Sequence, residues 1–435
     1  MSKKRVLILG AGVSGLSVAW HLGKKEQYEC VLLEKGSRPG GWMASQEDQG
    51  FLLEKGPHLF KTSRSADLLQ VIEEIGFSSS ILPSSSQAQS RYLWTDGVFQ
   101  KMPKSPIALL TSSFCRPILS SLWKERNVPS YFDDETIWDF ACRRFGETVA
   151  EHFFDPMVSG IYAGNIKKLS IASCFPILKQ WEREKGSVVK GVLAARSNKK
   201  TKPSCKAPLF SFQEGTSSFI EKWVSTLSVP LHCNEEILSL HREKEKWIAK
   251  SSQNTWEADS VIITMPSYAL APLLQEEAFA SAEILKSFDY EDLTTVSLGW
   301  EGEVLPFSAF GYLVPSKEKT PLLGVLFDSS MFARKNTLIT LMIRGIGYSE
   351  ESLYKIVDTV CLSHLNISQK PALFSTAEKK KAIPQYYLGH EEKKQQLLSS
   401  LSKEAPSLFL TGSYLNGVSI SDCIGQGKHL VDSCF

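Results

Sequence analysis

The sequence lacks an uninterrupted apolar run of the length that crosses a membrane, which takes about 20 residues as a helix. We therefore expect no membrane-spanning helix. Its nine cysteines are scattered singly and include no C-x-x-C pair. This spacing disfavours a zinc site or a disulfide framework and is typical of reduced thiols in the cytoplasm, so we expect no metal site.

An excess of charge of either sign is also missing, because the net charge is only +2. We therefore expect no nucleic-acid partner. There is no internal repeat, and 435 residues are enough for two or three domains. The first predicted strand begins at Lys4, which leaves no room for a signal peptide.

The organising feature is a strand, a glycine-rich turn, a helix and a second strand within the first 34 residues. Residues 4–9 are apolar, an apolar helical pattern starts at Leu16, and the second strand ends on Glu34, about 20 residues beyond the turn. The turn has a G-x-G-x-x-G pattern and consists of Gly10, Ala11, Gly12, Val13, Ser14 and Gly15. This order predicts a dinucleotide site and disfavours a merely structural glycine turn.

Each part of this fingerprint has a physical reason. Gly10 permits a tight turn, Gly12 lets backbone approach a pyrophosphate, and Gly15 lets the helix lie close to the strand. The N-terminus of the helix offers N–H groups to phosphates. Glu34 can accept hydrogen bonds from ribose hydroxyls and would repel a 2′-phosphate, which disfavours NADP.

Two further stretches favour FAD over NAD. Residues 38–42 (RPGGW) and 51–58 (FLLEKGPH) follow the ribose acid, and the pattern resembles the amine-oxidase-like FAD superfamily. Near the C-terminus, a strand ending at Gly412 leads to a helix start at 417–427 that contains three glycines. This second strand, turn and helix could also bring backbone N–H groups to a cofactor.

The middle of the chain reads as a substrate region. Arg91–Met102 predicts a hairpin with an Asp-Gly turn. Residues 293–300, 311–315, 322–327 and 337–343 predict an antiparallel sheet. An apolar helical pattern at 107–123 is compatible with a membrane-surface helix or an ordinary core helix. We expect 185–206 to be a basic polar loop.

Taken together, the sequence resembles the protoporphyrinogen oxidase family, and the resemblance runs essentially end to end. The motifs that carry it include RPGGW at 38–42, GIYAGN at 160–165, FGYLVPS at 310–316 and IPQY at 383–386. It implies an α/β, amine-oxidase-like fold with an FAD-binding Rossmann-like domain, an antiparallel-sheet substrate domain and a helical membrane-facing domain. The implied divisions are FAD-binding parts at 1–90, 206–268 and 385–435, the helical domain at 91–205 and the substrate domain at 269–384.

The resemblance also implies the chemistry. Six electrons leave a porphyrinogen as three hydride-type transfers to FAD, and oxygen or another acceptor reoxidises the flavin, giving hydrogen peroxide where it is oxygen. We expect protoporphyrinogen IX as substrate in haem biosynthesis, a homodimer, and a cytoplasmic location with peripheral contact to the inner face of the cell membrane.

The resemblance assigns residues by position. Arg91 is implied to pair with a substrate propionate, and a guanidinium suits a carboxylate by its two-pronged donor geometry. Phe310, Gly311 and Leu313 are implied to clamp the macrocycle, and Ala163 and Gly164 to form a close-packed floor of the substrate site beside the flavin. The implied cofactor residues beyond the turn and Glu34 are Lys35, Trp42, Gly56, Pro57, His58, Ile237, Ser413, Val418, Ser419 and Ile420.

No catalytic acid–base pair stands out, which suits chemistry carried by a flavin. His58, His390 and Asp422 are expected to have structural or cofactor-binding roles. Three alternatives remain. One is oxidation of coproporphyrinogen III, and another is an FAD oxidase of amines or carotenoids. The third is a non-enzymatic escort protein for small GTPases, which the intact glycines and Glu34 disfavour.

Overall fold

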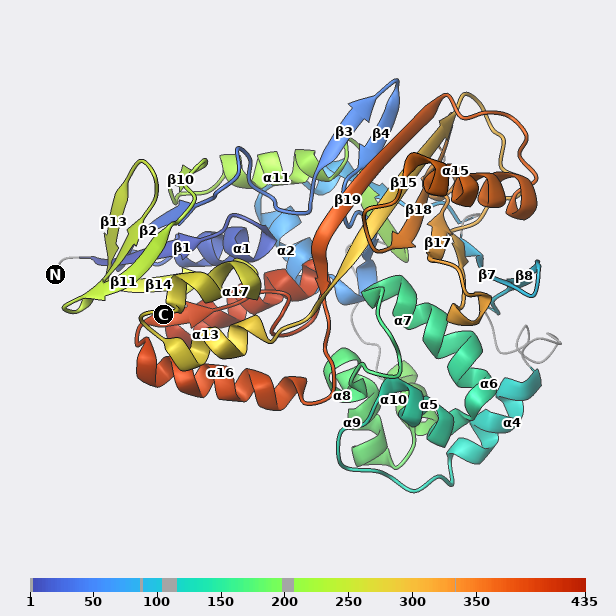
Figure 1. Cartoon of the computed structure of the whole chain (residues 1–435), viewed down its shortest axis with the longest axis horizontal. Coiled ribbons are helices and arrows are strands. Elements are labelled where there is room, and N and C mark those ends of the chain that lie inside the picture. Colours follow the sequence, from blue (N-terminus) through green and yellow to red (C-terminus); the bar gives the residue numbers. More distant parts are fainter. Residues whose placement is uncertain (1–2, 87–88, 104–115, 198–206, 333) are drawn as a thin grey trace. The chain divides into compact units, whose positions relative to one another are not determined.

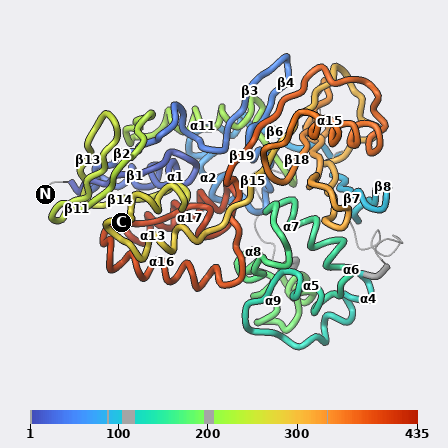
Figure 2. Tube along the Cα trace, viewed as in Figure 1, coloured from blue at the N-terminus to red at the C-terminus, as the bar shows by residue number. Residues whose placement is uncertain are grey.

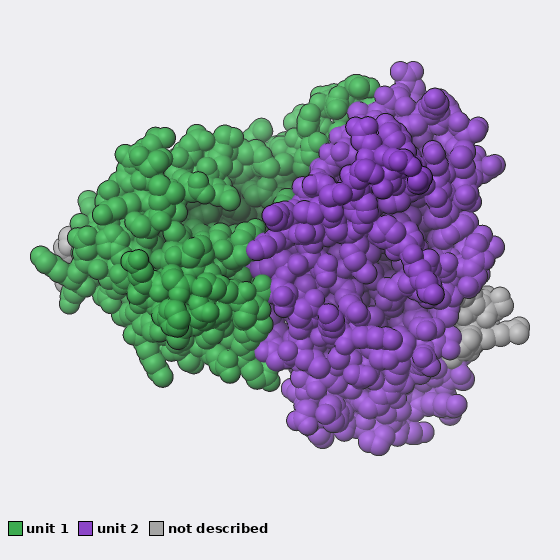
Figure 3. Space-filling view, in the orientation of Figure 1, with its two compact units in different colours: residues 1–83, 203–288, 391–435 green, residues 84–202, 289–390 purple. Residues whose placement is uncertain are grey.

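The computed structural model describes residues 3–86, 89–103, 116–197, 207–332 and 334–435. Of the apolar helical pattern predicted at 107–123, residues 107–115 lie outside these residues. The chain forms two compact units, each assembled from separate stretches of sequence (Figure 3). Unit 1 comprises residues 1–83, 203–288 and 391–435, and unit 2 comprises 84–202 and 289–390. No helix within the described ranges combines the length and apolar content needed to cross a membrane.

Unit 1 is built around a five-stranded parallel sheet in which strands from all three stretches lie side by side (Figures 1 and 2). In order across the sheet, the strands are β10 (Leu231–His232), β2 (Tyr28–Leu33), β1 (Lys4–Leu9), β14 (Ser260–Ile263) and β20 (Leu408–Leu410). The central strand β1 is buried from Val6 to Leu9. Such a continuous apolar run is expected of a parallel strand covered on both faces.

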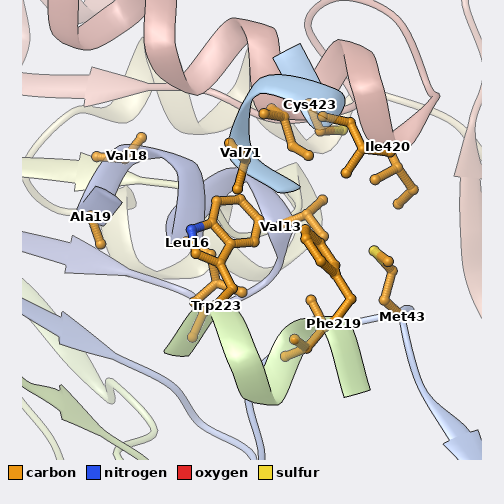
Figure 4. Close-up of a cluster of buried hydrophobic side chains, with 14 of the residues drawn as sticks. Val13, Leu16, Val18, Ala19, Met43, Val71, Phe219, Trp223, Ile420 and Cys423 are labelled. Carbon is orange, nitrogen blue, oxygen red and sulfur yellow. The ribbon is translucent and has the colours of Figure 1, made fainter. Parts of the chain in front are cut away.

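Helices and short sheets complete unit 1. The helices are α1 (Val13–Leu22), α2 (Ala66–Glu74), α11 (Thr216–Ser225), α12 (Ser267–Leu270), α13 (Phe279–Lys286), α16 (His390–Glu404) and α17 (Ile420–Cys434). The remaining strands are β3 (Ser45–Asp48), β4 (Phe51–Glu54), β5 (Phe60–Lys61), β6 (Ile81–Pro83), β9 (Leu209–Phe212), β11 (Ser239–Glu243), β12 (Lys246–Lys250) and β13 (Thr255–Ala258). Figure 4 shows Val13 and Leu16 of α1, Phe219 and Trp223 of α11, and Ile420 of α17 in one buried cluster.

Unit 2 contains a seven-stranded mixed sheet. Its order is β19 (Leu373–Pro384), β15 (Tyr290–Trp300), β18 (Thr337–Arg344), β17 (Leu322–Leu326), β16 (Gly311–Leu313), β7 (Arg91–Thr95) and β8 (Val98–Lys101). The predicted Asp-Gly hairpin is confirmed by the β7–β8 pairing. The predicted antiparallel sheet is confirmed for β15 to β18, whereas β16 and β7 pair in parallel.

The helices of unit 2 are α4 (Arg116–Glu125), α5 (Ile137–Phe145), α6 (Glu147–Val149), α7 (Asp155–Tyr162), α8 (Ile171–Cys174), α9 (Pro176–Lys185), α10 (Val188–Ser197), α14 (Asp328–Met331) and α15 (Glu350–Asp358). The expectation of a polar loop at 185–206 is wrong for Val188–Ser197, which is helical. Glu125 accepts hydrogen bonds from the backbone N–H groups of Val188 and Val189 and so caps this helix.

The helix α13 lies in unit 1, although the sequence-based divisions place residues 269–384 in a substrate domain. Glu404 of α16 accepts hydrogen bonds from the backbone and the hydroxyl of Ser281. These bonds hold α13 against another element of unit 1, and no local sequence pattern reports a contact of such long range.

Candidate FAD-binding and substrate sites

The glycine turn adopts the geometry that a dinucleotide requires. Gly10 has a φ of +105°, a conformation that side chains rarely permit. A Cβ on Gly15 would lie 1.8 Å from the carbonyl oxygen of Gly10, so only glycine lets α1 pack this close. A Cβ on Gly12 would meet nothing within 4 Å. The face at Gly12 is therefore open for a ligand.

The N-terminus of α1 is suited to an anion. Gly12 is its N-cap residue and contributes no side-chain hydrogen bond to the first turn. The N–H groups there are left to a ligand, and the helix dipole adds a partial positive charge. The predicted pyrophosphate site thus combines open space with donors.

Glu34 follows the end of β2 and points back toward the turn. Its carboxylate accepts hydrogen bonds from the backbone N–H groups of Ala11 and Gly36, each at 2.8 Å. The two bonds fix the carboxylate beside the turn, and each oxygen retains a lone pair for a ribose hydroxyl. Lys35 follows it and is exposed.

The loop after β2 closes over the glycine turn. The N–H of Gly40 donates to the carbonyl of Ala11 at 2.8 Å, and Gly12 and Gly40 form a parallel bridge. The guanidinium of Arg38 donates to the carbonyls of Pro39, Gly41 and Met43. Arg38 is a residue that sequence reasoning did not place at the site, although it opens the RPGGW motif, because its role is to shape the loop.

Other predicted cofactor residues cluster on loops of unit 1. Trp42 is exposed. A Cβ on Gly56 would lie 2.0 Å from the carbonyl oxygen of Trp42, so the two backbones pack closely. Pro57 follows it, and the imidazole of His58 is buried with Nδ1 3.0 Å from the Gly56 carbonyl oxygen. Ile237 is half-buried two residues beyond Glu235, whose N–H donates to the Glu34 carbonyl. Their contact with FAD stays a prediction.

The C-terminal stretch forms a second strand, turn and helix. Gly412 has a φ of +146°, and Ser413 and Val418 are half-buried. Ser419 caps α17 in a capping box with Asp422, which gives Asp422 a structural role. Ile420 begins the helix and packs into the core (Figure 4).

The helix α17 is locked against α1 at small residues. The hydroxyl of Ser17 donates to the Ile424 carbonyl at 2.7 Å, and a Cβ on Gly427 would lie 2.8 Å from that of Ser17. Burial raises the pKa of the nearby Cys423 to about 12, so this thiol stays protonated and is unsuited to nucleophilic chemistry.

The predicted substrate residues all lie in unit 2. Gly311 pairs with Arg91, and Leu313 with Leu93, so Arg91, Gly311 and Leu313 share one face of the sheet. The guanidinium of Arg91 lies 5.0 Å from the centre of the Phe310 ring. Arg91 and Phe310 are thus in contact, and Gly311 and Leu313 lie on the strand that pairs with β7.

Arg91 has the electrostatics of an anion site. Surrounding protein atoms lower the pKa of its guanidinium, although the side chain is still open to solvent and stays charged. Among the residues that the structure describes, no carboxylate forms an ion pair with it. A partly desolvated cation of this kind favours an anionic ligand.

Ala163 and Gly164 lie at the C-terminal end of α7. This helix packs on β16, since a Cβ on Gly160 would come 2.8 Å from Leu313 Cδ2. His390 stacks on Tyr386 at 4.2 Å, also in unit 2. The roles of these residues toward substrate or flavin stay predictions.

The donors and spaces of unit 1 fit FAD, since an open backbone at Gly12, an uncapped helix N-terminus and a fixed carboxylate match a dinucleotide. The chain matches the family described as flavin containing amine oxidoreductase over residues 13–432. It belongs to that family, and it is an FAD-dependent oxidoreductase.

The relatives define its place in the family. The chain is 30% identical to protoporphyrinogen oxidase of Macaca fascicularis, covering 98% of this chain and 97% of the relative. It is 26% identical to coproporphyrinogen III oxidase of Bacillus subtilis (strain 168), over 99% and 97%. The chain belongs to this branch of haem-biosynthesis oxidases, which confirms the resemblance drawn from the motifs.

Solved structures support the fold. A crystal structure from Exiguobacterium sp. 255-15 superposes with a TM-score of 0.84 at 22% identity, covering 100% of this chain and 99% of the other. Cyclohexylamine oxidase from Brevibacterium oxydans IH-35A gives 0.72 at 13% identity, covering 99% and 98%. The amine-oxidase-like α/β fold predicted from the sequence is thus confirmed.

Proposed function

We propose that this oxidoreductase converts protoporphyrinogen IX to protoporphyrin IX in haem biosynthesis. The observation that carries the proposal is Arg91, a cation without an ion-pair partner in the described part of the chain, beside Phe310 and the apolar sheet face of Leu313. A porphyrinogen is a large apolar ring with carboxylate arms, and this face offers a surface for the ring and a cation for an arm. The named relatives act on such compounds.

In the proposed reaction, the substrate loses six hydrogen atoms as three pairs of a hydride and a proton. The glycine turn and Glu34 would hold FAD, which would supply the hydride acceptor. For each pair, one oxygen molecule would take up the two electrons and two protons and become one hydrogen peroxide, so three are formed per substrate. The chain supplies orientation: Arg91 holds a propionate, and Phe310 and Leu313 exclude water from the ring. The site residues include no acid–base pair, so positioning is the main contribution of the protein.

Replacement of Arg91 tests the substrate assignment. We expect Arg91→Leu to lower kcat/KM by roughly one to two orders of magnitude, chiefly through KM, because a hydrogen bond to a charged group contributes about 1.5–3 kcal/mol. Arg91→Lys keeps the charge but loses the two-pronged geometry, so its kcat/KM should lie between those of the wild type and Arg91→Leu. Steady-state kinetics with protoporphyrinogen IX measure this, and wild-type values in the leucine variant would contradict the role.

Coproporphyrinogen III is the alternative substrate, supported by the relative from Bacillus subtilis (strain 168). It carries four propionates and protoporphyrinogen IX carries two. The kinetics above, run with both compounds, decide between them, since the larger kcat/KM identifies the substrate.

We also propose peripheral contact with the inner face of the cell membrane, by a homodimer located in the cytoplasm. The support for the membrane contact comes from the end of α4, where Trp123 is 72% exposed beside Lys124 and Arg126. An exposed aromatic ring flanked by cations suits the headgroup region of an anionic bilayer. Sedimentation velocity tests the dimer.

Cosedimentation with vesicles that contain anionic phospholipid tests the membrane contact. Trp123→Ala should reduce the bound fraction several-fold, because aromatic side chains anchor proteins at the interface. The control is Phe279→Ala, which removes another exposed aromatic ring, on α13 of unit 1. An equal effect of both variants, or no binding by the wild type, would refute the proposal.

A further inference from the structure

The turn at the end of α7 has an unusual backbone. Ala163 is its C-cap residue and adopts the left-handed conformation, with a φ of +50°. This conformation is unfavourable for a residue with a Cβ. It persists only where the surroundings enforce it.

Two side chains from the sheet enforce it. The Nε of Arg344, the last residue of β18, donates to the carbonyl of Ala163 at 2.9 Å. The Nε2 of Gln385, just after β19, donates to the carbonyl of Tyr162 at 2.8 Å. Consecutive carbonyls of the turn are therefore held from separate strands, both visible with α7 in Figure 1.

Gln385 also fills the space against Gly164. A Cβ on Gly164 would lie 2.2 Å from the Oε1 of Gln385. Gln385 is only 3% exposed, and its backbone N–H donates to the carbonyl of Asp289 at 2.9 Å. The amide is thus fixed, and it in turn fixes where the Gly164 backbone can lie.

Arg344 lies on the sheet face that carries the predicted substrate residue Leu313. Leu313 pairs with Gly324 and Gly324 with Met342, so these three share one face. Arg344 follows Met342 by two residues and therefore points to the same side. The IPQY motif at 383–386 thereby acquires a role that its sequence did not reveal.

We propose that Arg344 and Gln385 are positioning residues that set the Ala163–Gly164 floor for the tetrapyrrole. The inference rests on the proposed function, because Ala163 and Gly164 are substrate contacts only within it. Neither side chain needs to touch the substrate. Each acts through a backbone carbonyl of the turn.

The test compares Arg344→Met and Gln385→Met, which remove the donors but keep comparable bulk. We expect each to lower kcat/KM about tenfold or more, because small misplacements of a bound substrate are costly. The Kd for protoporphyrin, measured by fluorescence titration, should rise in parallel. FAD content should match that of Lys380→Met, which removes an exposed cation from β19. Tm should fall only modestly below that of this control, by the loss of the donors to the turn.

Arg344→Lys retains a donor and should recover part of the loss. It also keeps the proposal testable if the methionine variants do not fold. The proposal is overturned if these variants lose Tm or FAD while the folded fraction keeps wild-type kcat/KM and Kd. Failure of the wild type to oxidise or bind any tetrapyrrole would instead refute the proposed function.

Discussion

Gly12→Val is expected to give a folded protein that retains no FAD. The new side chain would enter space that is empty of protein within 4 Å of its Cβ, so the apoprotein should accept it. The backbone of Gly12 has a φ of −67°, which valine also adopts. The side chain would, however, occupy the face that the pyrophosphate needs. The ratio of flavin absorbance to protein absorbance after purification measures the loss.

Two further variants serve as comparisons in this experiment. Gly12→Ala should weaken FAD binding less, because its side chain is smaller. Gly15→Ala should instead destabilise the apoprotein, since its Cβ would lie 1.8 Å from the Gly10 carbonyl oxygen. Stability is compared with wild type stripped of flavin, because bound ligand raises Tm. A Gly12→Val protein with the flavin content of the wild type would contradict the site.

Arg144→Met is expected to cost about 3–5 kcal/mol of folding stability, because it removes one partner from a buried charge network. Arg144 and its ion-pair partners Glu125 and Glu182 have fully buried side chains. Glu125 also caps α10, and Glu182 also pairs with Lys179. Loss of the guanidinium would leave two buried carboxylates with less compensation.

Thermal and urea unfolding of FAD-loaded protein measure this effect. Arg143→Met is the comparison variant, because Arg143 is 27% exposed and both of its partners, Glu135 and Glu182, also pair with Lys179. Its loss should cost clearly less, because Arg143 is partly solvated and Lys179 still pairs with both carboxylates. Equal unfolding curves for Arg144→Met and wild type would contradict a stabilising role for the buried pairs.

The parts of the fold that were predictable are encoded locally. The turn at Gly10–Gly15 and the hairpin at Asp96-Gly97 can be predicted from residue type, because few residues tolerate their backbone angles. The parallel pairing of β16 with β7 was not predictable, because it joins segments more than 200 residues apart and has no local signature. The family motifs identified Arg91 and Phe310, and the structure added that they meet.

The features that the sequence did not predict also depend on contacts between distant parts of the chain. The basic stretch at 185–206 looks like a loop, but Glu125 supplies the helix cap from a distant position. Arg38, Arg344 and Gln385 act on backbone carbonyls, and such roles leave no pattern in the sequence. Sequence motifs therefore nominate candidate ligand contacts more readily than the residues that hold those contacts in place.

Anaerobic mixing with protoporphyrinogen IX in a stopped-flow instrument tests the central claim most directly. The oxidised flavin band at about 450 nm should bleach rapidly, because a porphyrinogen oxidase reduces its own flavin without oxygen. Bleaching should be slower with coproporphyrinogen III, which is the less preferred substrate in the proposal. The reverse order would make coproporphyrinogen III the substrate. An FAD-loaded protein that neither compound bleaches would contradict the claim.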